Sequence, residues 1–291
     1  MLSHLEKCVF QKGWSDWAAV ESTNKLIFLG IASAFQSRDQ IFSPNPSGTA
    51  LKIDMLNRVF AIHPYPSFPH FAQNLPSMLP AIILDPKPKE TILDMCAAPG
   101  GKTTHLLEIL AKQTSDFSSI YACEKSKSRS KKLMENCKGH NMHIIVNDAS
   151  KMDSLKDDNG PTVSFESYFD KILLDAPCSG TGQRPRKIVP IDDDRQISKQ
   201  HIKVQQKLFK NAVKMLKSGG VLVYSTCSVQ IEENHDIIDW ALKNFDLNLQ
   251  VPDIPFGVKS DQGILFNPFT TSTDSIDSDT IGFFVTKLIK K

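Results

Sequence analysis

The chain has 291 residues, of which 41% are hydrophobic and 23% are charged, and its formal net charge is +2. This length and composition are typical of a soluble globular protein with one large domain and a smaller part beside it. No apolar stretch approaches the ~20 residues that a membrane span requires, and a net charge of +2 does not by itself indicate a nucleic-acid partner.

The N-terminal residues and the cysteines bear on the compartment. Residues 1–8 lack a basic segment followed by an apolar core, so no secretory signal is predicted. The six cysteines stand at positions 8, 96, 123, 137, 178 and 227 and include no Cys-x-x-Cys pair. This spacing argues against a zinc or thioredoxin-like site. We therefore expect no metal ion, and free thiols in a reducing compartment, the cytoplasm or the nucleus.

The first 62 residues differ from the rest of the chain. Short strands are predicted at residues 25–30 and 50–54, separated by a turn rich in Ser, Pro and Gly. Three prolines then indicate a turn-rich connection, and Leu75-Pro-Ser77 predicts the start of a short helix. We expect a small β-rich part over residues 1–62, a connecting segment over residues 63–86 and the main domain over residues 87–291.

From about residue 87, strand-like and helix-like segments alternate. Strands are predicted at residues 91–95, 119–123, 143–146, 171–175, 221–225 and 282–287. Helices are predicted after a glycine-rich turn as far as Lys112, over a basic segment after residue 124, and over residues 200–217 and 232–244. This alternation indicates an α/β domain with a doubly wound, mostly parallel sheet. The acidic stretch at residues 270–280 is predicted to be a loop.

A glycine-rich turn, Asp94-Met-Cys-Ala-Ala-Pro-Gly-Gly-Lys-Thr103, follows the first of these strands and allows two interpretations. In a nucleotide-binding P-loop, Gly101-Lys102-Thr103 fits, but Cys96 occupies the position of the first glycine. Asp175 would then be the ligand of a magnesium ion.

The second interpretation is a nucleoside cofactor bound along the same turn. Glu124, which ends the second strand, would hold the ribose hydroxyls, and Asp148 near the end of the third would bind the amino group of an adenine. Either acid alone is as consistent with a solvated strand end. Because acidic residues end successive strands, we favour cofactor binding.

Two cysteines follow buried strands. Cys178 comes after the strand that ends at Asp175, and Cys227 after the strand over residues 221–225. Because parallel strands end at one edge of the sheet, both thiols and the Asp175 carboxylate are expected to lie together there. Thiolates are good nucleophiles and good leaving groups, so the pair indicates covalent chemistry. The alternative is that each cysteine is a small buried hydrophobic residue.

In combination, these motifs resemble the Sun-domain (NSUN) family of RNA cytosine-5 methyltransferases. The likeness rests on residues 94–103, 175–182 and 224–228, and Glu233-Asn234 and residues 281–284 extend it. Gln73-Asn-Leu-Pro-Ser77 and Gln183-Arg-Pro185 resemble the sixth branch of the family, which modifies the acceptor-stem region of tRNA and carries a PUA RNA-binding domain. Residues 28–30 and 48–53 resemble only the C-terminal strands of that domain, which implies an N-terminal truncation.

The resemblance implies a class I methyltransferase with a Rossmann-like doubly wound sheet, preceded by a β-rich remnant of the PUA-like domain. It implies S-adenosyl-L-methionine as the cofactor and RNA, specifically tRNA, as the substrate; we expect a monomer without a membrane partner. The cofactor-binding residues that it implies are Cys96, Ala97, Ala98, Pro99, Gly100, Gly101, Lys102, Glu124, Arg129, Asp148 and Asp175.

In this family resemblance, Cys227 is the thiol that attacks carbon 6 of the cytosine, which makes carbon 5 nucleophilic. Asp175 would hold N3 and the amino group of the base, and Lys102 would orient Asp175 or the base. Cys178 would assist release of the adduct, as a base or through a water molecule. A stacked cytosine cannot reach the thiol, so the target must be unpaired or extruded.

Basic residues near these motifs are candidates for RNA contacts. Arg184, Arg186 and Lys187 border the predicted reaction site and are the better candidates. A second basic group, Lys125, Lys127, Lys131 and Lys132, is more consistent with a solvated helix face. Two other functions stay open, a catalytically inactive RNA-binding paralogue and, less favoured, a P-loop nucleotidase.

Overall fold

The computed structural model describes residues 73–111, 113–156, 162–183, 191–254, 257–267 and 280–291, together with the backbone of four short strands nearer the N-terminus. These strands are β1 (Ala18–Ser22), β2 (Lys25–Leu29), β3 (Ala50–Ile53) and β4 (Val59–Ile62). β1 pairs with β2, and β4 pairs with β3 and with β5 (Gln73–Asn74), all antiparallel. β2 and β3 match the strands predicted there. The other residues of the predicted PUA-like part lie outside the described residues, as do residues 270–279 of the predicted loop.

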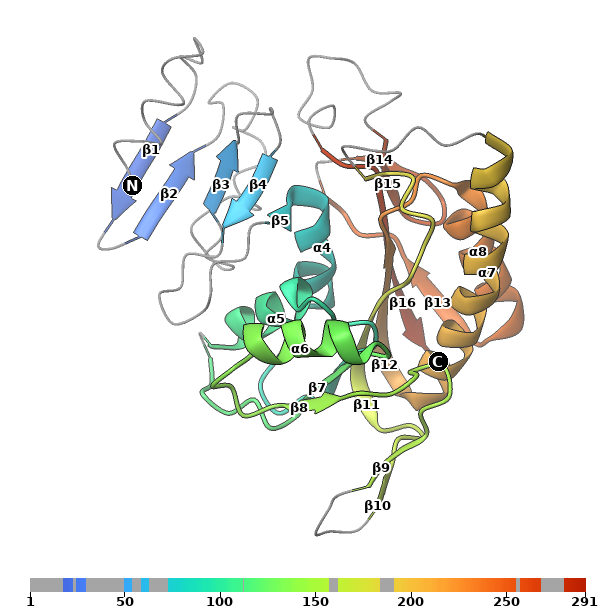
Figure 1. The fold of residues 1–291 in the computed structure, drawn as a ribbon, viewed down its shortest axis with the longest axis horizontal. Helices are drawn as coiled ribbons and strands as arrows, with labels where there is room; N and C mark the ends of the chain where they lie inside the picture. Colours follow the sequence, from blue (N-terminus) through green and yellow to red (C-terminus); the bar gives the residue numbers. More distant parts are fainter. Residues whose placement is uncertain are drawn as a thin grey trace.

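Nine strands of the described residues form one mixed sheet (Figure 1). Its order is β14 (Val258–Lys259), β15 (Ile264–Phe266), β16 (Phe283–Lys290), β12 (Leu216–Thr226), β11 (Phe169–Asp175), β6 (Ile92–Asp94), β7 (Ile120–Cys123) and β8 (His143–Ile145), and β13 (Leu247–Gln250) also pairs with β16. β12, β11, β6, β7 and β8 are parallel, whereas β16 is antiparallel to β12. The predicted doubly wound, mostly parallel sheet is confirmed.

Helices cover both faces of this sheet (Figure 1). One layer contains α4 (Leu75–Leu84), α5 (Gly101–Ala111) and α6 (Lys127–Asn136), and the other contains α7 (Ile191–Met215), the short 3-10 helix η1 (Ile231–Glu233) and α8 (His235–Asn244). Alternating residues of β11 supply the two cores, because Ile172 and Leu174 pack with the α7 and α8 side and Leu173 packs with the other. Burial on both faces explains why the central strands are continuous apolar runs.

The segment predicted as a connection, residues 63–86, contains α4, and this helix is part of the first layer. Met78, Leu79 and Leu84 are almost fully buried and belong to the same core cluster as Leu106 and Leu107 of α5. α4 begins with a proline in its first turn, where the missing N–H is not needed, and ends at Asp85 in the left-handed region.

Two helix boundaries differ from the prediction. α7 begins at Ile191, whereas the prediction began at residue 200. The earlier turns were not predicted because they contain Asp192, Asp193 and Asp194 and show no apolar period. Acidic residues stabilise the N-terminal end of a helix through its dipole, which explains why this polar stretch is helical. The predicted helix over residues 232–244 is divided into η1 and α8 at Asn234.

Several short strands were not predicted, among them β1, β4, β5, β13, β14 and β15. β9 (Ser154–Lys156) and β10 (Thr162–Ser164) form an antiparallel hairpin that projects from the domain (Figure 1). Within the described part of the chain, no helix has the length and apolar composition needed to cross a membrane.

Candidate active site

The two cysteine-bearing loops leave the sheet side by side. β11 and β12 are neighbouring parallel strands, and Asp175 at the end of β11 is in register with Ser225 of β12. The loops that follow these strands therefore start at the same edge of the sheet. The Sγ atoms of Cys178 and Cys227 lie 3.3 Å apart. The predicted meeting of both thiols with the Asp175 carboxylate at one edge agrees with this geometry.

Backbone contacts fix the loops against the start of β16. The N–H of Gly182 donates to Cys227 O at 3.0 Å, and the N–H of Gly282 donates to Gly182 O at 2.8 Å. A Cβ atom on Gly182 would lie 2.1 Å from Gly282 O, a distance that no side chain tolerates. The two glycines thus allow three segments, distant in sequence, to meet at the thiols.

Glu233 holds the loop that carries Cys178. Its side chain is fully buried, and its carboxylate accepts hydrogen bonds from the backbone N–H of Ser179, at 3.1 and 3.2 Å from the two oxygens, and from Ser179 Oγ at 2.9 Å. A buried carboxylate is stable only with such donors. Sequence reasoning included Glu233 only as an extension of the motif likeness and did not assign this role.

Asn234, the next residue, holds the segment that carries Cys227. Its Oδ1 accepts from Thr226 Oγ1 at 2.6 Å, and its Nδ2 donates to Ser228 O at 2.9 Å. One acid at the end of η1 and one amide directly after it therefore position both cysteine loops. An acid–amide pair shortly after a strand and its cysteine turn is the signal that could have indicated this role.

The surroundings distinguish the two thiols. A hydrogen bond in which either thiol can be the donor joins the two sulfurs; it lowers the pKa of Cys227 and raises the pKa of Cys178 well above its ordinary value. The positive charge of Lys102 and a hydrogen bond from Gln183 Nε2, 3.4 Å from Cys227 Sγ, also lower the pKa of Cys227. Cys227 is thus the thiol that ionises first, while Cys178 keeps its proton.

Lys102 forms an ion pair with Asp175. Its Nζ lies 2.7 Å from Asp175 Oδ2, and Ser225 Oγ donates to Asp175 Oδ1 at 2.7 Å. The two side chains are 14% and 29% exposed, so the pair is partly shielded from water. Lys102 starts from the glycine-rich turn at the beginning of α5, and the pair therefore joins this turn to the end of β11.

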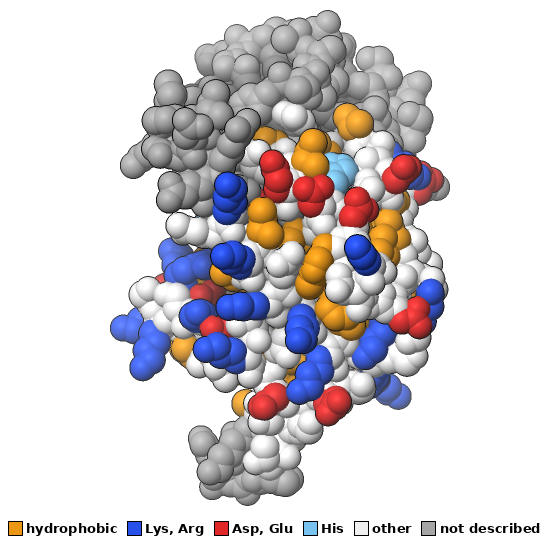
Figure 2. Space-filling model, turned by 90° about the vertical axis from the view of Figure 1, so that its right-hand side faces the viewer, with side chains coloured by type: hydrophobic (Ala, Val, Ile, Leu, Met, Phe, Trp, Pro, Cys, Tyr) orange, Lys and Arg blue, Asp and Glu red, His pale blue; other side chains and the backbone are white. Residues whose placement is uncertain are grey.

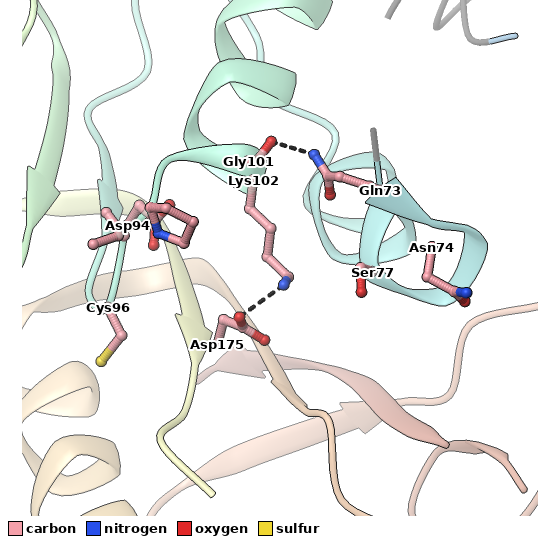
Figure 3. A pocket seen from close by; sticks show the side chains of 11 residues that line it. Gln73, Asn74, Ser77, Asp94, Cys96, Gly101, Lys102 and Asp175 are labelled. Atoms are coloured by element: carbon pink, nitrogen blue, oxygen red, sulfur yellow. Dashed lines mark hydrogen bonds and ion pairs between the residues drawn. The ribbon is translucent and has the colours of Figure 1, made fainter. Parts of the chain in front are cut away.

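A cavity of about 240 Å³ lies beside this ion pair (Figure 3). Its lining residues come from the glycine-rich turn, from the ends of β6 and β11 and from the start of α4: Gln73, Asn74, Ser77, Asp94, Cys96, Ala97, Ala98, Pro99, Gly101, Lys102 and Asp175. In Figure 3, Asp94 and Cys96 stand on one side of the Lys102–Asp175 pair, and Ser77 and Asn74 stand on the other. Six of the seven predicted cofactor residues in the turn line this cavity, whereas Gly100, at φ +112°, lines neither of the two cavities described here.

Asp94 is an unusual carboxyl group at the base of this cavity. It is 1% exposed, its Oδ2 accepts from Thr103 Oγ1 at 2.8 Å, and its Oδ1 has no hydrogen-bond partner among the described residues. Burial raises its pKa to about 7, against an ordinary value of 3.8. Asp94 is thus a buried carboxyl group in the wall of this cavity, with one acceptor oxygen that is not hydrogen-bonded within the described residues.

A second cavity, of about 680 Å³, shares Cys96 with the first. Glu124 and Asp148 lie in its wall, as predicted for the ends of two successive strands, with Arg129, Pro177 and Leu208. Glu124 is 4% exposed, and its Oε1 accepts from the N–H of Ser126 at 2.8 Å. Burial would raise the pKa of Asp148, but hydrogen bonds from Lys125 and Ser150 outweigh it and lower the pKa to about 2.

The acidic residues of this second cavity suit a nucleoside. The carboxylates of Glu124 and Asp148 in its wall can accept hydrogen bonds from ribose hydroxyls and an adenine amino group. An ion pair joins Arg129 Nη1 to Glu124 Oε2 at 3.6 Å, and Arg129 Nη2 donates to Ala98 O. Arg129 therefore connects Glu124 to the backbone of the glycine-rich turn. The P-loop interpretation finds no such support. Arg184, Arg186 and Lys187 lie outside the described residues.

Comparison with known proteins gives consistent matches. Residues 81–289 match the model of the family described as 16S rRNA methyltransferase RsmB/F. The tRNA (cytosine(72)-C(5))-methyltransferase NSUN6 of Homo sapiens is 34% identical, covering 96% of this chain and 66% of its own length. The Mus musculus NSUN6 is 35% identical, covering 91% and 59%.

A solved structure agrees with these matches. NSun6 from Pyrococcus horikoshii with SFG, an analogue of S-adenosylmethionine, is 34% identical with a TM-score of 0.61, covering 76% of this chain and 53% of that one. The chain thus spans less than two thirds of the length of the two mammalian relatives.

Proposed function

Because the chain belongs to the RsmB/F family of methyltransferases, we propose that it transfers the methyl group of S-adenosylmethionine to carbon 5 of a cytosine in RNA, with tRNA as the substrate class. The observation that carries this proposal is the unequal thiol pair, Cys227 and Cys178, beside the Asp175 carboxylate. The tRNA substrate is supported by the names of the human and mouse relatives.

The two cavities fit the cofactor. Glu124 would accept from the ribose hydroxyls, Asp148 from the adenine amino group, and the glycine-rich turn over residues 96–101 would lie against the remainder. Asp94 and the Lys102–Asp175 pair give the wall of the first cavity carboxyl groups and a cation. When bound, S-adenosylmethionine supplies a methyl group on a positively charged sulfur.

Bond formation begins at Cys227. Its thiolate adds to carbon 6 of the cytosine, a bond forms between Sγ and carbon 6, and the electron pair of the 5,6 double bond becomes available at carbon 5. The Asp175 carboxylate accepts a hydrogen bond from the amino group of the cytosine, and Lys102 keeps this carboxylate in place. Carbon 5 would then accept the methyl group, and the electron pair of the broken carbon–sulfur bond would stay on the cofactor sulfur, which leaves as a neutral thioether.

Release of the product breaks the bond between Cys227 Sγ and carbon 6. A base at Cys178, its thiolate or a water molecule that it polarises, takes the proton from carbon 5. The electron pair re-forms the 5,6 double bond, and Cys227 leaves carbon 6 as a thiolate. The hydrogen bond that raises the pKa of Cys178 in the free protein disappears once Cys227 is bonded to carbon. Cys178 therefore becomes a stronger acid at the step that needs its ionised form.

Substitution of each cysteine tests this proposal. With labelled S-adenosylmethionine and a tRNA pool, Cys227→Ala should abolish methyl transfer, and Cys178→Ala should accumulate a protein–RNA adduct that resists SDS. Cys137→Ala, which changes a buried cysteine far in sequence from both loops, is the control and should retain transfer. Full turnover by Cys227→Ala would reject the assignment, and RNA binding without any methyl transfer by the wild type would support the inactive RNA-binding alternative. Bisulfite mapping then identifies the cytosine.

We also propose that residues 1–62 are part of a PUA-like RNA-binding domain. The match to the human relative covers 96% of this chain and therefore extends into this region. We propose a cytoplasmic location, since both reactive thiols must stay reduced. We also propose that the chain is a monomer.

A further inference from the structure

The outward face of α7 carries five exposed lysines that the proposed chemistry does not use: Lys199, Lys203, Lys207, Lys210 and Lys214. We name these residues the lysine face. They are spaced by three or four residues, so they project within an arc of about 80° along roughly 22 Å of helix axis. The opposite side of α7 is buried through Leu208, Phe209 and Ala212. Figure 2 shows that Lys and Arg side chains form a broad band across this side of the molecule.

Within the segment of α7 that carries the lysine face, the sequence has no acidic residue to balance this charge. Residues 199–215 contain no Asp or Glu, and among the described residues no carboxylate lies within 4.0 Å of the lysine face. Elsewhere, Lys102, Lys125 and Lys217 form ion pairs of 2.7 to 2.8 Å. Like charges three or four residues apart destabilise a helix, and solubility is served equally well by mixed charges. The net charge of the whole chain is only +2, so this face concentrates positive charge.

The lysine face is connected to the candidate active site. Gln205, which is fully buried on the inner side of α7, donates from Nε2 to Pro177 O at 3.0 Å, next to Cys178. Lys207 lines the second cavity together with three other basic residues, Lys125, Arg129 and Lys151. The helix that carries the lysine face therefore contacts the segment beside Cys178 and borders the second cavity.

We propose that the lysine face of α7 binds the phosphate backbone of the RNA substrate beyond the target cytosine. This inference rests on the proposed function, since the RNA is its partner. Ammonium groups on long flexible stems neutralise phosphates without reading bases, and they release counterions when they do so. The lysine face thus contributes affinity and orientation, whereas the choice of cytosine depends on the loops.

The test removes three charges that lie away from the cavities. Lys199, Lys203 and Lys210 are replaced by Gln in one variant, and Lys207 is kept because it lines the second cavity. A control variant replaces three exposed lysines of other segments by Gln: Lys87, Lys138 and Lys259. Both variants lose the same net charge, so any difference between them reflects position. Binding of a fluorescein-labelled pool of unmodified tRNA transcripts is measured by anisotropy over a series of salt concentrations.

The lysine-face variant should show a salt dependence of log K that is less steep by about 2, from about 0.7 per lost phosphate contact. For equal binding at 1 M salt, this change corresponds to about 100-fold weaker binding at 0.1 M. Affinity for S-adenosylhomocysteine and the melting temperature should stay at the wild-type values. Equal salt slopes and affinities of the two variants would overturn the inference, as would a wild type that does not bind RNA.

The outcomes separate this inference from the proposed function. If the wild type methylates RNA and the lysine-face variant binds RNA like the control, the proposed function is supported and the RNA-binding role of the lysine face is rejected. If the wild type transfers no methyl group and the lysine-face variant loses salt-dependent binding, the proposed function is rejected and the RNA-binding role of the lysine face is supported.

Discussion

Glu233→Ala tests whether the position of Cys178 depends on a single buried carboxylate. The substitution removes the acceptor of the Ser179 backbone N–H and of Ser179 Oγ, while Tyr224 OH still donates to the main-chain oxygen of residue 233 at 2.7 Å. Hydrogen bonds to charged groups contribute about 1.5–3 kcal/mol, and a buried donor left without a partner costs about 1–3 kcal/mol. Release of the buried charge offsets part of this loss. We expect the free energy of unfolding to fall by about 2–4 kcal/mol.

Function should change in a way that simple destabilisation does not produce. Because Ser179 follows Cys178, loosening this loop should slow the release step, so the RNA adduct should accumulate as it does in Cys178→Ala. The double variant Cys178→Ala/Glu233→Ala should hold no more adduct than Cys178→Ala alone, since Glu233 acts through the position of Cys178. Glu233→Gln keeps one acceptor oxygen and should restore part of the activity.

Urea denaturation and SDS gels of the adduct provide the two measurements. The matched control is Glu232→Ala, an exposed neighbour on the same turn of η1, which should leave stability and adduct level unchanged. The reasoning fails if Glu233→Ala is as stable as Glu232→Ala. It also fails if adduct and turnover fall together, in proportion to the folded fraction.

Two further predictions concern titration. Lys102→Met removes a positive charge that lowers the pKa of Cys227. The pH midpoint of Cys227 alkylation by iodoacetamide, monitored by mass spectrometry, should therefore move to higher pH. An unchanged midpoint would show that Lys102 does not act on this thiol. The Asp94 carboxyl has a pKa of about 7 against 3.8, so its stabilisation is complete below pH 3.8 and is lost as the pH rises towards 7. At 1.36 kcal/mol per unit the full effect is about 4 kcal/mol, of which about 2–3 kcal/mol falls between pH 5 and pH 8. Asp94→Asn should abolish this part of the pH dependence in urea denaturation, and parallel curves for both proteins would contradict it.

The sequence predicted the part of the site that depends on strand order. Cys178, Cys227 and Asp175 follow apolar runs, and because parallel strands end at one edge, their proximity follows from topology alone. Glu124 and Asp148 were located for the same reason. These predictions needed no knowledge of side-chain packing.

The parts that sequence reasoning missed depend on tertiary contacts. The hydrogen bonds of Glu233 and Asn234 join residues about fifty positions apart or connect short irregular segments, and no periodicity reports such contacts. The first turns of α7 were not predicted, because they lack an apolar period and only their acidic residues are typical of a helix start. β13, β14 and β15 are two to four residues long, and they are strands because β16 or a neighbour pairs with them, which is a tertiary effect on weak local preferences.

The asymmetry of the thiols follows from where each loop is anchored. Both sulfurs occupy the same edge of the sheet and lie 3.3 Å apart, so their chemical difference cannot come from burial alone. Cys227 faces the cation of Lys102 and the amide of Gln183, whereas Cys178 has the carboxylate of Glu233 beside its loop. The hydrogen bond between the two sulfurs contributes most, because it lowers the pKa of Cys227 and raises the pKa of Cys178. Burial and Asp175 oppose the lowering at Cys227, whereas Lys102 and Gln183 add to it, so the two pKa values differ before any substrate binds. Two thiols in equivalent surroundings would share one proton, and neither would be suited to attack or to assist release. We therefore infer that the residues around the two cysteine loops, as much as the cysteines, determine which sulfur attacks and which assists release.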